Sequence, residues 1–77
     1  MLITIKYFGQ ISEVTQKNEE QLEVISDSVG GLLKNLYALY EGLKEKDFQI
    51  AQDQELVHLE SELTGKEIAL LPPFSGG

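Results

Sequence analysis

The sequence feature that most constrains the fold is an apolar run that ends at two prolines. Residues 68–71 read Ile-Ala-Leu-Leu, and Pro72 and Pro73 follow directly. A short, unbroken apolar run of this kind is typical of a strand that is buried on both faces and lies inside a sheet. A proline has no N–H for a sheet ladder, and a proline pair holds the backbone near polyproline II. We therefore expect the chain to leave the sheet at residue 72 as a stiff, extended tail.

The tail has the composition of a segment that enters another protein. Residues 72–77 read Pro-Pro-Phe-Ser-Gly-Gly and can reach roughly 20 Å at about 3.3 Å per residue. Gly76 and Gly77 lack a Cβ, so the last peptide unit fits a channel too narrow for other residues. Many chain ends are frayed, and a terminal glycine pair is often only a linker remnant. The buried strand, the prolines and Phe74 favour insertion, with the Gly77 carboxylate as the reacting group.

Length, charge and cysteine content exclude several function classes. The 77 residues predict one small domain without an enclosed active site. The chain has no cysteine, which excludes disulfides, a thiolate nucleophile and a Cys-ligated metal, and fits a reducing compartment. A net charge of −7 argues against nucleic acid and favours a partner with a basic docking surface. Neither a membrane-length apolar run nor a signal-peptide pattern is present, so we expect a cytoplasmic protein without a membrane partner.

The first third of the chain predicts two strands. Residues 2–8 alternate between two faces, which indicates a strand that begins almost at the first residue. Apolar residues then recur at three-residue spacing over residues 8–14, which suits one or two short helical turns. Residues 20–25 alternate again, with Leu22 and Val24 facing inward. The simplest arrangement pairs this second strand antiparallel to the first.

Residues 29–43 carry the one long helical pattern in the sequence. Ser28 is the predicted N-cap because its hydroxyl can accept from a free N–H of the first turn. Gly30 and Gly31 lie in that first turn and either allow close packing there or are simply tolerated by the helix. They do not form a phosphate-binding loop, since no phosphate-loop motif surrounds them. Gly42 is the predicted C-terminal stop. The apolar stripe of this helix comprises Val29, Leu32, Leu33, Leu36, Leu39, Tyr40 and Leu43.

The last part of the chain predicts three further strands. Residues 48–51 form the third strand, residues 52–55 a turn, residues 56–59 a short fourth strand, and residues 68–71 the last. The order strand, strand, helix, strand, strand, strand predicts an α+β domain. It has a mixed sheet of about five strands and one main helix packed on one face. We expect the last strand in the middle of the sheet, parallel to the first.

The alternation of the last strand divides its side chains between the two faces. Ile68 and Leu70 should pack with the helix and the first strand, against Ile3, Ile5, Leu32 and Leu36. Ala69 and Leu71 remain on the far face, close to the tail, and together with Phe8 they form a predicted apolar docking patch. For Phe8 a place in a secondary core under the short helix is equally consistent with the sequence.

Three motifs are informative: Ile-Lys-Tyr-Phe-Gly-Gln at residues 5–10, Leu-Thr-Gly-Lys-Glu-Ile-Ala at residues 63–69 and Leu-Pro-Pro-Phe-Ser-Gly-Gly at residues 71–77. They closely resemble the MoaD family of ubiquitin-like sulfur carriers, the small subunits of molybdopterin synthase. The resemblance covers the whole chain. Its specific part is the Pro-Pro-x-x-Gly-Gly ending, because a terminal Gly-Gly alone fits any ubiquitin-like carrier. This chain departs from the family at Phe74, where valine is more common, and at the glycine pair of the predicted helix.

The resemblance implies a fold and a division of the chain. The implied fold is the ubiquitin-like β-grasp, which agrees with the architecture predicted above. It assigns residues 1–71 to a β-grasp domain and residues 72–77 to an extended functional tail.

The resemblance also implies a reaction in which the chain is a non-catalytic sulfur-donor subunit. An ATP-dependent activating enzyme adenylates the Gly77 carboxylate, and a persulfide sulfurtransferase supplies the sulfur for a thiocarboxylate. The large subunit of molybdopterin synthase then takes up the tail, in a heterotetramer of two small and two large subunits, and the sulfur passes to the pterin precursor of the molybdenum cofactor. The chain itself binds no cofactor. The implied channel residues are Pro72, Pro73, Phe74, Ser75 and Gly76.

Other candidate chemistry in the sequence is weak. His58 is the single histidine, and on a predicted strand it is best interpreted as a surface or edge residue, so we expect no metal site. Glu19 and Glu20, and also Glu60 and Glu62, could act as paired carboxylates. Since no apolar surroundings would raise their pKa values, solvated charge is the better interpretation.

Three function classes remain open at this point. The first is the molybdopterin synthase subunit. The second is a sulfur carrier or protein modifier of another pathway, which serves thiamine, tRNA thiolation, cysteine synthesis or lysine conjugation. The third is a ubiquitin-like interaction domain whose tail has no chemical role.

Overall fold

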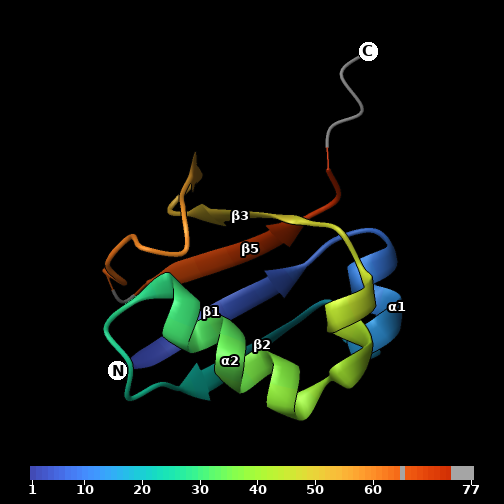
Figure 1. The fold of residues 1–77 in the computed structure, drawn as a ribbon, viewed down its shortest axis with the longest axis horizontal. Helices are drawn as coiled ribbons and strands as arrows, with labels where there is room; N and C mark the ends of the chain where they lie inside the picture. Colours follow the sequence, from blue (N-terminus) through green and yellow to red (C-terminus); the bar gives the residue numbers. More distant parts are fainter. Residues whose placement is uncertain (65, 74–77) are drawn as a thin grey trace.

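The computed structural model describes residues 1–64 and 66–73, and within them five strands form one mixed sheet (Figure 1). The strands are β1 (Leu2–Tyr7), β2 (Glu19–Glu23), β3 (Gln49–Gln52), β4 (Glu55–Leu56) and β5 (Glu67–Leu71). Their spatial order is β2-β1-β5-β3-β4. β1 and β5 pair in parallel, and the other pairs are antiparallel. The predicted central position of the last strand, parallel to the first, is confirmed.

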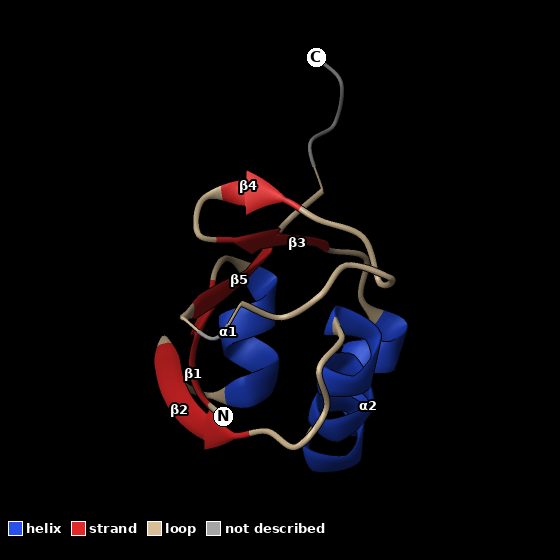
Figure 2. Ribbon diagram, turned by 90° about the vertical axis from the view of Figure 1, so that its left-hand side faces the viewer, coloured by secondary structure: helices blue, strands red, loops and turns tan. Residues whose placement is uncertain are grey.

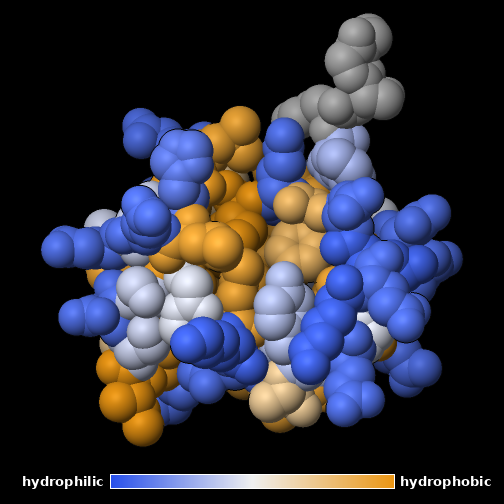
Figure 3. Space-filling model, in the orientation of Figure 1, coloured by the Kyte–Doolittle hydropathy of each residue, from blue (hydrophilic) through white to orange (hydrophobic). Residues whose placement is uncertain are grey.

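Helix α2 (Val29–Leu39) covers one face of the sheet (Figure 2). Helix α1 (Gln10–Thr15) and the 3₁₀ helix η1 (Glu41–Glu45) lie together at one end. From the helix side, apolar side chains remain visible between α2 and the neighbouring strands (Figure 3). Within the described residues no helix is long and apolar enough to cross a membrane. One main helix on a mixed sheet is the predicted fold class, the β-grasp.

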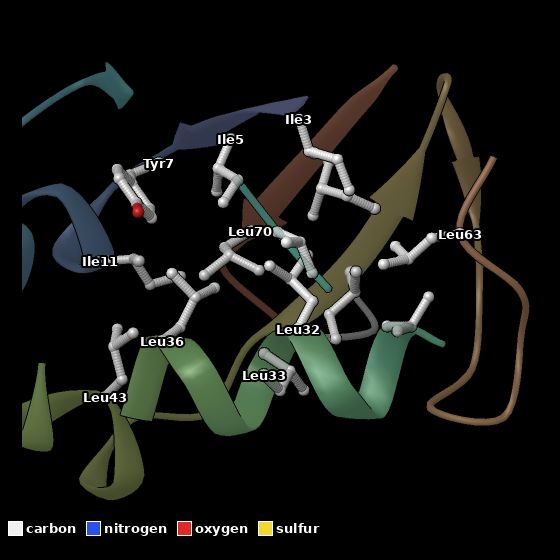
Figure 4. Close-up of a cluster of buried hydrophobic side chains, with 14 residues drawn as sticks. Ile3, Ile5, Tyr7, Ile11, Leu32, Leu33, Leu36, Leu43, Leu63 and Leu70 are labelled. Atoms are coloured by element: carbon white, nitrogen blue, oxygen red, sulfur yellow. The ribbon is translucent and has the colours of Figure 1, made fainter. Parts of the chain in front are cut away.

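The core lies between α2 and the sheet (Figure 4). Its members include Ile68 and Leu70 of β5 together with Ile3, Ile5, Leu32 and Leu36, as predicted, and each is 1% exposed or less. Alternate residues of β1 point into this cluster, because successive side chains of a strand face opposite sides of a sheet. The predicted division of side chains between the two faces is therefore confirmed for both central strands.

The start of α2 confirms the predicted cap and explains the two glycines. Ser28 Oγ accepts a hydrogen bond from the Gly31 N–H at 3.1 Å. A Cβ on Gly31 would overlap the Ser26 side chain, and a Cβ on Gly30 would lie 3.2 Å from the Leu59 carbonyl oxygen. Both glycines therefore serve close packing, which decides between the two interpretations that the sequence left open.

The predicted helix over residues 29–43 is too long. α2 ends at Leu39, which is 57% exposed and lies outside the apolar stripe, and η1 follows after Tyr40. The tighter 3₁₀ turn, with three residues per turn, brings Leu43 back into the core at 0% exposure. Gly42 is not a helix stop. A Cβ there would lie 3.0 Å from Val14 Cγ1, so glycine allows η1 to approach α1 closely.

The strand boundaries differ from the prediction mainly at the β3–β4 hairpin. The turn consists of Asp53 and Gln54, which have φ values of 49° and 72°. Two consecutive residues with positive φ are typical of a two-residue hairpin turn, so β4 begins at Glu55 and not at residue 56. β4 ends after two residues, and residues 57–59 lie outside the sheet. β2 also ends earlier than predicted, which leaves Ile25 99% exposed.

A polar cluster joins β1, β2 and the end of α2. The hydroxyls of Tyr7 and Tyr40 donate to Glu20 Oε2 at 2.5 and 2.6 Å, and Lys17 Nζ donates to Glu20 Oε1 at 3.1 Å. The Glu20 side chain is 13% exposed, so the prediction of solvated charge at this residue is wrong. Burial alone would raise the pKa of Glu20, but the hydrogen bonds from Tyr40, Tyr7 and Lys17 outweigh it and hold the pKa below its usual value.

Replacing Glu20 should therefore weaken the fold in a pH-dependent way. A pKa that is lower in the folded chain stabilises the fold above the usual carboxyl pKa, and this stabilisation is lost as the pH falls through the folded value. We expect Glu20→Gln to lower the free energy of unfolding by about 1–2 kcal/mol near neutral pH and by less at about pH 3. Urea unfolding at both pH values measures this, with the exposed Glu19→Gln as control. An equal loss of unfolding free energy at both pH values would show that the ionised form of Glu20 does not stabilise the fold.

Candidate functional site: the outer sheet face and the base of the tail

The parallel pairing of β1 with β5 places the end of β1 beside the exit of the tail. The Phe8 N–H donates to the Leu70 carbonyl at 3.1 Å, directly after the last paired residues of the two strands. Gly9 follows with φ of 61°, a conformation that favours glycine. A Cβ on Gly9 would lie 2.8 Å from Pro72 Cγ. Gly9 therefore allows both the turn after β1 and the close approach of the first tail residue.

The structure describes only the base of the predicted tail. Pro72 and Pro73 follow β5 directly and are exposed. The positions of the two prolines agree with the predicted end of the strand at residue 71. The remaining predicted tail residues lie outside the described part of the chain, so their roles stay predictions: Phe74, Ser75, Gly76 and Gly77.

The three residues of the predicted docking patch lie at the same end of the outer sheet face, the face opposite α2. Ala69 and Leu71 alternate with the buried Ile68 and Leu70, so they share the outer face, and both are partly exposed. Phe8 is 43% exposed and lies beside the end of β5. This exposure favours the patch over the alternative that buries Phe8 under α1.

Two further apolar residues extend this patch, and the sequence analysis missed both. Ala51 pairs with Ala69 across β3 and β5, and Leu56 pairs with Ala51 across β3 and β4. Directly paired residues project to the same face of a sheet, so Ala51 and Leu56 share the face of Ala69. Leu56 is 60% exposed, whereas Ala51 is only 7% exposed, so Ala51 shares the position of the patch but adds little accessible surface. We call the five residues the outer-face patch: Phe8, Ala51, Leu56, Ala69 and Leu71.

The chemistry of the outer face changes from the tail base toward the β2 edge. Lys6 and Glu67 form an ion pair with Nζ and Oε1 at 3.2 Å. β2 at the edge of the sheet contributes the exposed acidic side chains of Glu19 and Glu23. An apolar patch with an acidic neighbourhood suits a partner surface that is apolar at its centre and basic at its rim. The basic partner surface expected from the net charge stays a prediction.

Gln49 supplies a polar group close to the tail base. It pairs with Leu71 in the sheet register. Its side-chain Oε1 is buried and has no hydrogen-bond partner in the described part of the chain. An unsatisfied buried acceptor costs about 1–3 kcal/mol.

The described residues contain no arrangement suited to a metal ion. No group of three or more His, Asp or Glu side chains that could hold a metal occurs in residues 1–64 and 66–73. His58 is exposed, and its backbone N–H donates to Ser61 Oγ at 3.1 Å. His58 lies just beyond β4, so the expectation of a surface residue near the sheet edge is confirmed.

The sequence matches the profile of the ThiS family over residues 5–77. The chain belongs to the ThiS family. No protein with a curated function matches this ThiS-family chain in sequence. Its fold is that of the MoaD-like, ubiquitin-like sulfur carriers, which confirms the resemblance inferred from the three motifs.

Solved structures with the same fold include proteins of more than one kind. A putative molybdopterin converting factor subunit 1 from Pyrococcus furiosus has a TM-score of 0.88 and 22% identity, with 96% of this chain and 99% of that chain covered. SAMP1, small archaeal modifier protein 1, from Haloferax volcanii has a TM-score of 0.81 and 25% identity, with both chains covered fully. A chain from the complex of subunits 1 and 2 of molybdopterin-converting factor from Helicobacter pylori has a TM-score of 0.69 and 28% identity, again with 100% of each chain covered.

The contact between Gly9 and Pro72 predicts a cost for any side chain at residue 9. We expect Gly9→Ala to lower the free energy of unfolding by about 1–2 kcal/mol, because alanine is strained at positive φ and its Cβ displaces Pro72. Thermal unfolding measures the loss, and Gln10→Ala, an exposed neighbour, is the control. A Gly9→Ala variant as stable as wild type would show that the contact does not constrain the tail base.

Proposed function

We propose that this ThiS-family protein is the sulfur-carrying small subunit of a molybdopterin synthase. The observation that carries the proposal is the combination of two features in one chain. The β-grasp domain presents an apolar patch at the exit of its last strand, and the sequence continues from there as Pro-Pro-Phe-Ser-Gly-Gly. The Helicobacter pylori relative occurs in a complex of subunits 1 and 2 of molybdopterin-converting factor, which supports a large-subunit partner for this chain.

The proposed chemistry takes place on the Gly77 carboxylate. An α-carboxyl has a reference pKa of about 3.5, so at neutral pH it is an ionised nucleophile that needs no general base. A carboxylate oxygen attacks the α-phosphorus of ATP on the activating enzyme, and pyrophosphate leaves. A partner's persulfide then displaces AMP, and a partner thiol cleaves the resulting acyl disulfide, which leaves a thiocarboxylate on Gly77. This chain supplies only the carboxyl group that accepts the sulfur. We place the reaction in the cytoplasm, where ATP is available.

The described residues serve this chemistry by presenting the tail. Fixing a flexible backbone costs about 1–2 kcal/mol per residue, and Pro72 and Pro73 lower this cost because their φ angles are already restricted. Gly9 holds Pro72 close to the end of β1. The outer-face patch gives the large subunit an apolar surface next to the tail, so that docking of the domain and insertion of the tail occur together.

A second candidate function uses the same tail in another pathway. SAMP1 from Haloferax volcanii matches this chain over its full length, and CysO of Amycolatopsis orientalis, solved in a complex with BexX, shares the fold with a TM-score of 0.73. An acyl-adenylate on Gly77 can be captured by a lysine amine as well as by a persulfide. The chain would then be a sulfur carrier or protein modifier that serves thiamine, tRNA thiolation, cysteine synthesis or lysine conjugation.

Changing the position of the terminal carboxylate should abolish the proposed function without affecting the fold. The test is molybdopterin formation by the purified chain with its activating enzyme, ATP, a persulfide source, the large subunit and the pterin precursor. We expect no product when Gly77 is deleted or when one residue is added after it, and unchanged thermal unfolding in both variants.

Two results would overturn parts of this proposal. Molybdopterin formation by the extended variant would remove Gly77 as the reacting group. If the unmodified chain is adenylated and sulfurated but yields no molybdopterin with the large subunit, the second candidate function replaces the first.

The outer-face patch should contribute to binding independently of the tail. We expect Phe8→Asp to weaken binding to the large subunit by about tenfold or more, because a charge would be buried against an apolar partner surface. Leu39→Asp is a matched control, since Leu39 is exposed to a similar degree on α2. Calorimetric titration gives both affinities. Equal losses in the two variants would show that the patch is not the docking surface.

A further inference from the structure

The helix side of the molecule carries an open groove of about 1020 Å³ between α2 and the segments around β3 and β4. Figure 3 shows apolar side chains on this side of the molecule between hydrophilic ones. The volume lies at the upper end of the range for ligand sites, about 300–1,000 Å³. The apolar walls are formed by Leu33, Tyr37, Phe48, Ile50, Leu56, Val57 and Leu59, and of these Leu56 also belongs to the outer-face patch.

The groove exists because the chain leaves the sheet after two residues of β4. Residues 57–59 lie outside the strands, and the Gly30 N–H donates to the Leu59 carbonyl at 2.8 Å. Glycine is needed there, because a Cβ on Gly30 would lie 3.2 Å from that carbonyl oxygen. One end of the groove is therefore closed by a hydrogen bond between α2 and Leu59, and the walls are fixed by the fold.

The apolar walls remain accessible to a partner. Leu59 is 55% exposed, and Tyr37, Phe48 and Val57 are partly exposed. Aromatic side chains such as Tyr37 and Phe48 contribute most of the affinity at protein–protein interfaces.

The charges at the groove differ from those of the rest of the chain. Its border carries Lys34 and Lys46 against the single acid Asp47, whereas the whole chain has a net charge of −7. No ion pair of Lys34 or Lys46 occurs within the described residues. The two ammonium groups are thus available to an anionic partner, which is the opposite of the basic partner that suits the outer-face patch.

We propose that this groove binds a short, extended, acidic and apolar segment of a second partner protein. The α2 wall from Gly30 to Tyr37 measures about 10 Å at 1.5 Å per residue, which matches three or four extended residues at about 3.3 Å each. In an extended segment alternate side chains face opposite sides, so apolar residues reach the walls while acidic residues reach the lysines at the border. The groove opens mainly on the helix side of the sheet and the outer-face patch lies on the other, and Leu56 of the edge strand β4 is the one patch residue that also lines the groove.

A titration with a defined peptide tests this proposal. The probe is a capped eight-residue peptide in which aspartate alternates with leucine and phenylalanine, added to the full chain labelled with nitrogen-15. We expect saturable amide shift changes at residues of the groove walls and none at the patch residues Phe8, Ala69 and Leu71. A second peptide with lysine in place of aspartate should not bind.

Charge reversal at the border provides the matched variants. We expect Lys34→Glu combined with Lys46→Glu to weaken peptide binding by about tenfold. Lys44→Glu is the control, because Lys44 is an exposed lysine of η1 that does not line the groove.

Three results would overturn the proposal. They are absence of shift changes with the acidic peptide, equal binding of the lysine peptide, and equal effects of the border and control variants. Shift changes at the groove that depend on protein concentration alone would assign the surface to a second copy of the chain instead. The test involves neither ATP nor the tail, so its outcome is independent of the proposed sulfur transfer.

Discussion

The parallel pairing of β1 with β5 is the constraint on which the rest of the structure depends. Parallel neighbours need a long crossover connection, and here the crossover contains β2, both helices, β3 and β4. Because the two strands point the same way, the end of β1 lies where β5 releases the chain, and Gly9 packs against Pro72. Ile5 and Leu70 anchor this pair in the core. The tail therefore leaves from two rigid strands and not from a loop, which fixes its starting point for a partner.

The sheet also separates two surfaces of different chemistry. Its outer face combines the apolar patch at the tail base with an acidic edge, and its helix side carries an apolar groove bordered by Lys34 and Lys46. A carrier has to meet an enzyme that loads it and another that unloads it, and both need the same tail. The proposed groove partner binds mainly on the other side of the sheet from the outer-face patch, which allows it to stay bound during this exchange. The small size of the chain thus does not limit it to one partner at a time.

The sequence predicted those features that depend on local patterns. Alternation identified the central strands and the patch residues Ala69 and Leu71, and the cap at Ser28 is a property of neighbouring residues. It missed what depends on distant contacts. The helical periodicity placed Tyr40 in the apolar stripe of the predicted helix. In the structure its hydroxyl donates a hydrogen bond to Glu20, which is 20 residues away in the sequence. The membership of Leu56 in the patch depends on a turn with positive φ at Asp53 and its neighbour, where sequence rules favour glycine or asparagine.

The intact mass of the chain tests the central claim most directly. The purified protein is incubated with ATP, its activating enzyme and a persulfide source, and is then mixed with the large synthase subunit and the pterin precursor. The account predicts a mass increase equal to the replacement of one oxygen by sulfur, located at Gly77 by fragmentation, which disappears as molybdopterin forms. A chain whose mass never changes with any activating partner would contradict the account and leave a β-grasp binding module without carrier chemistry.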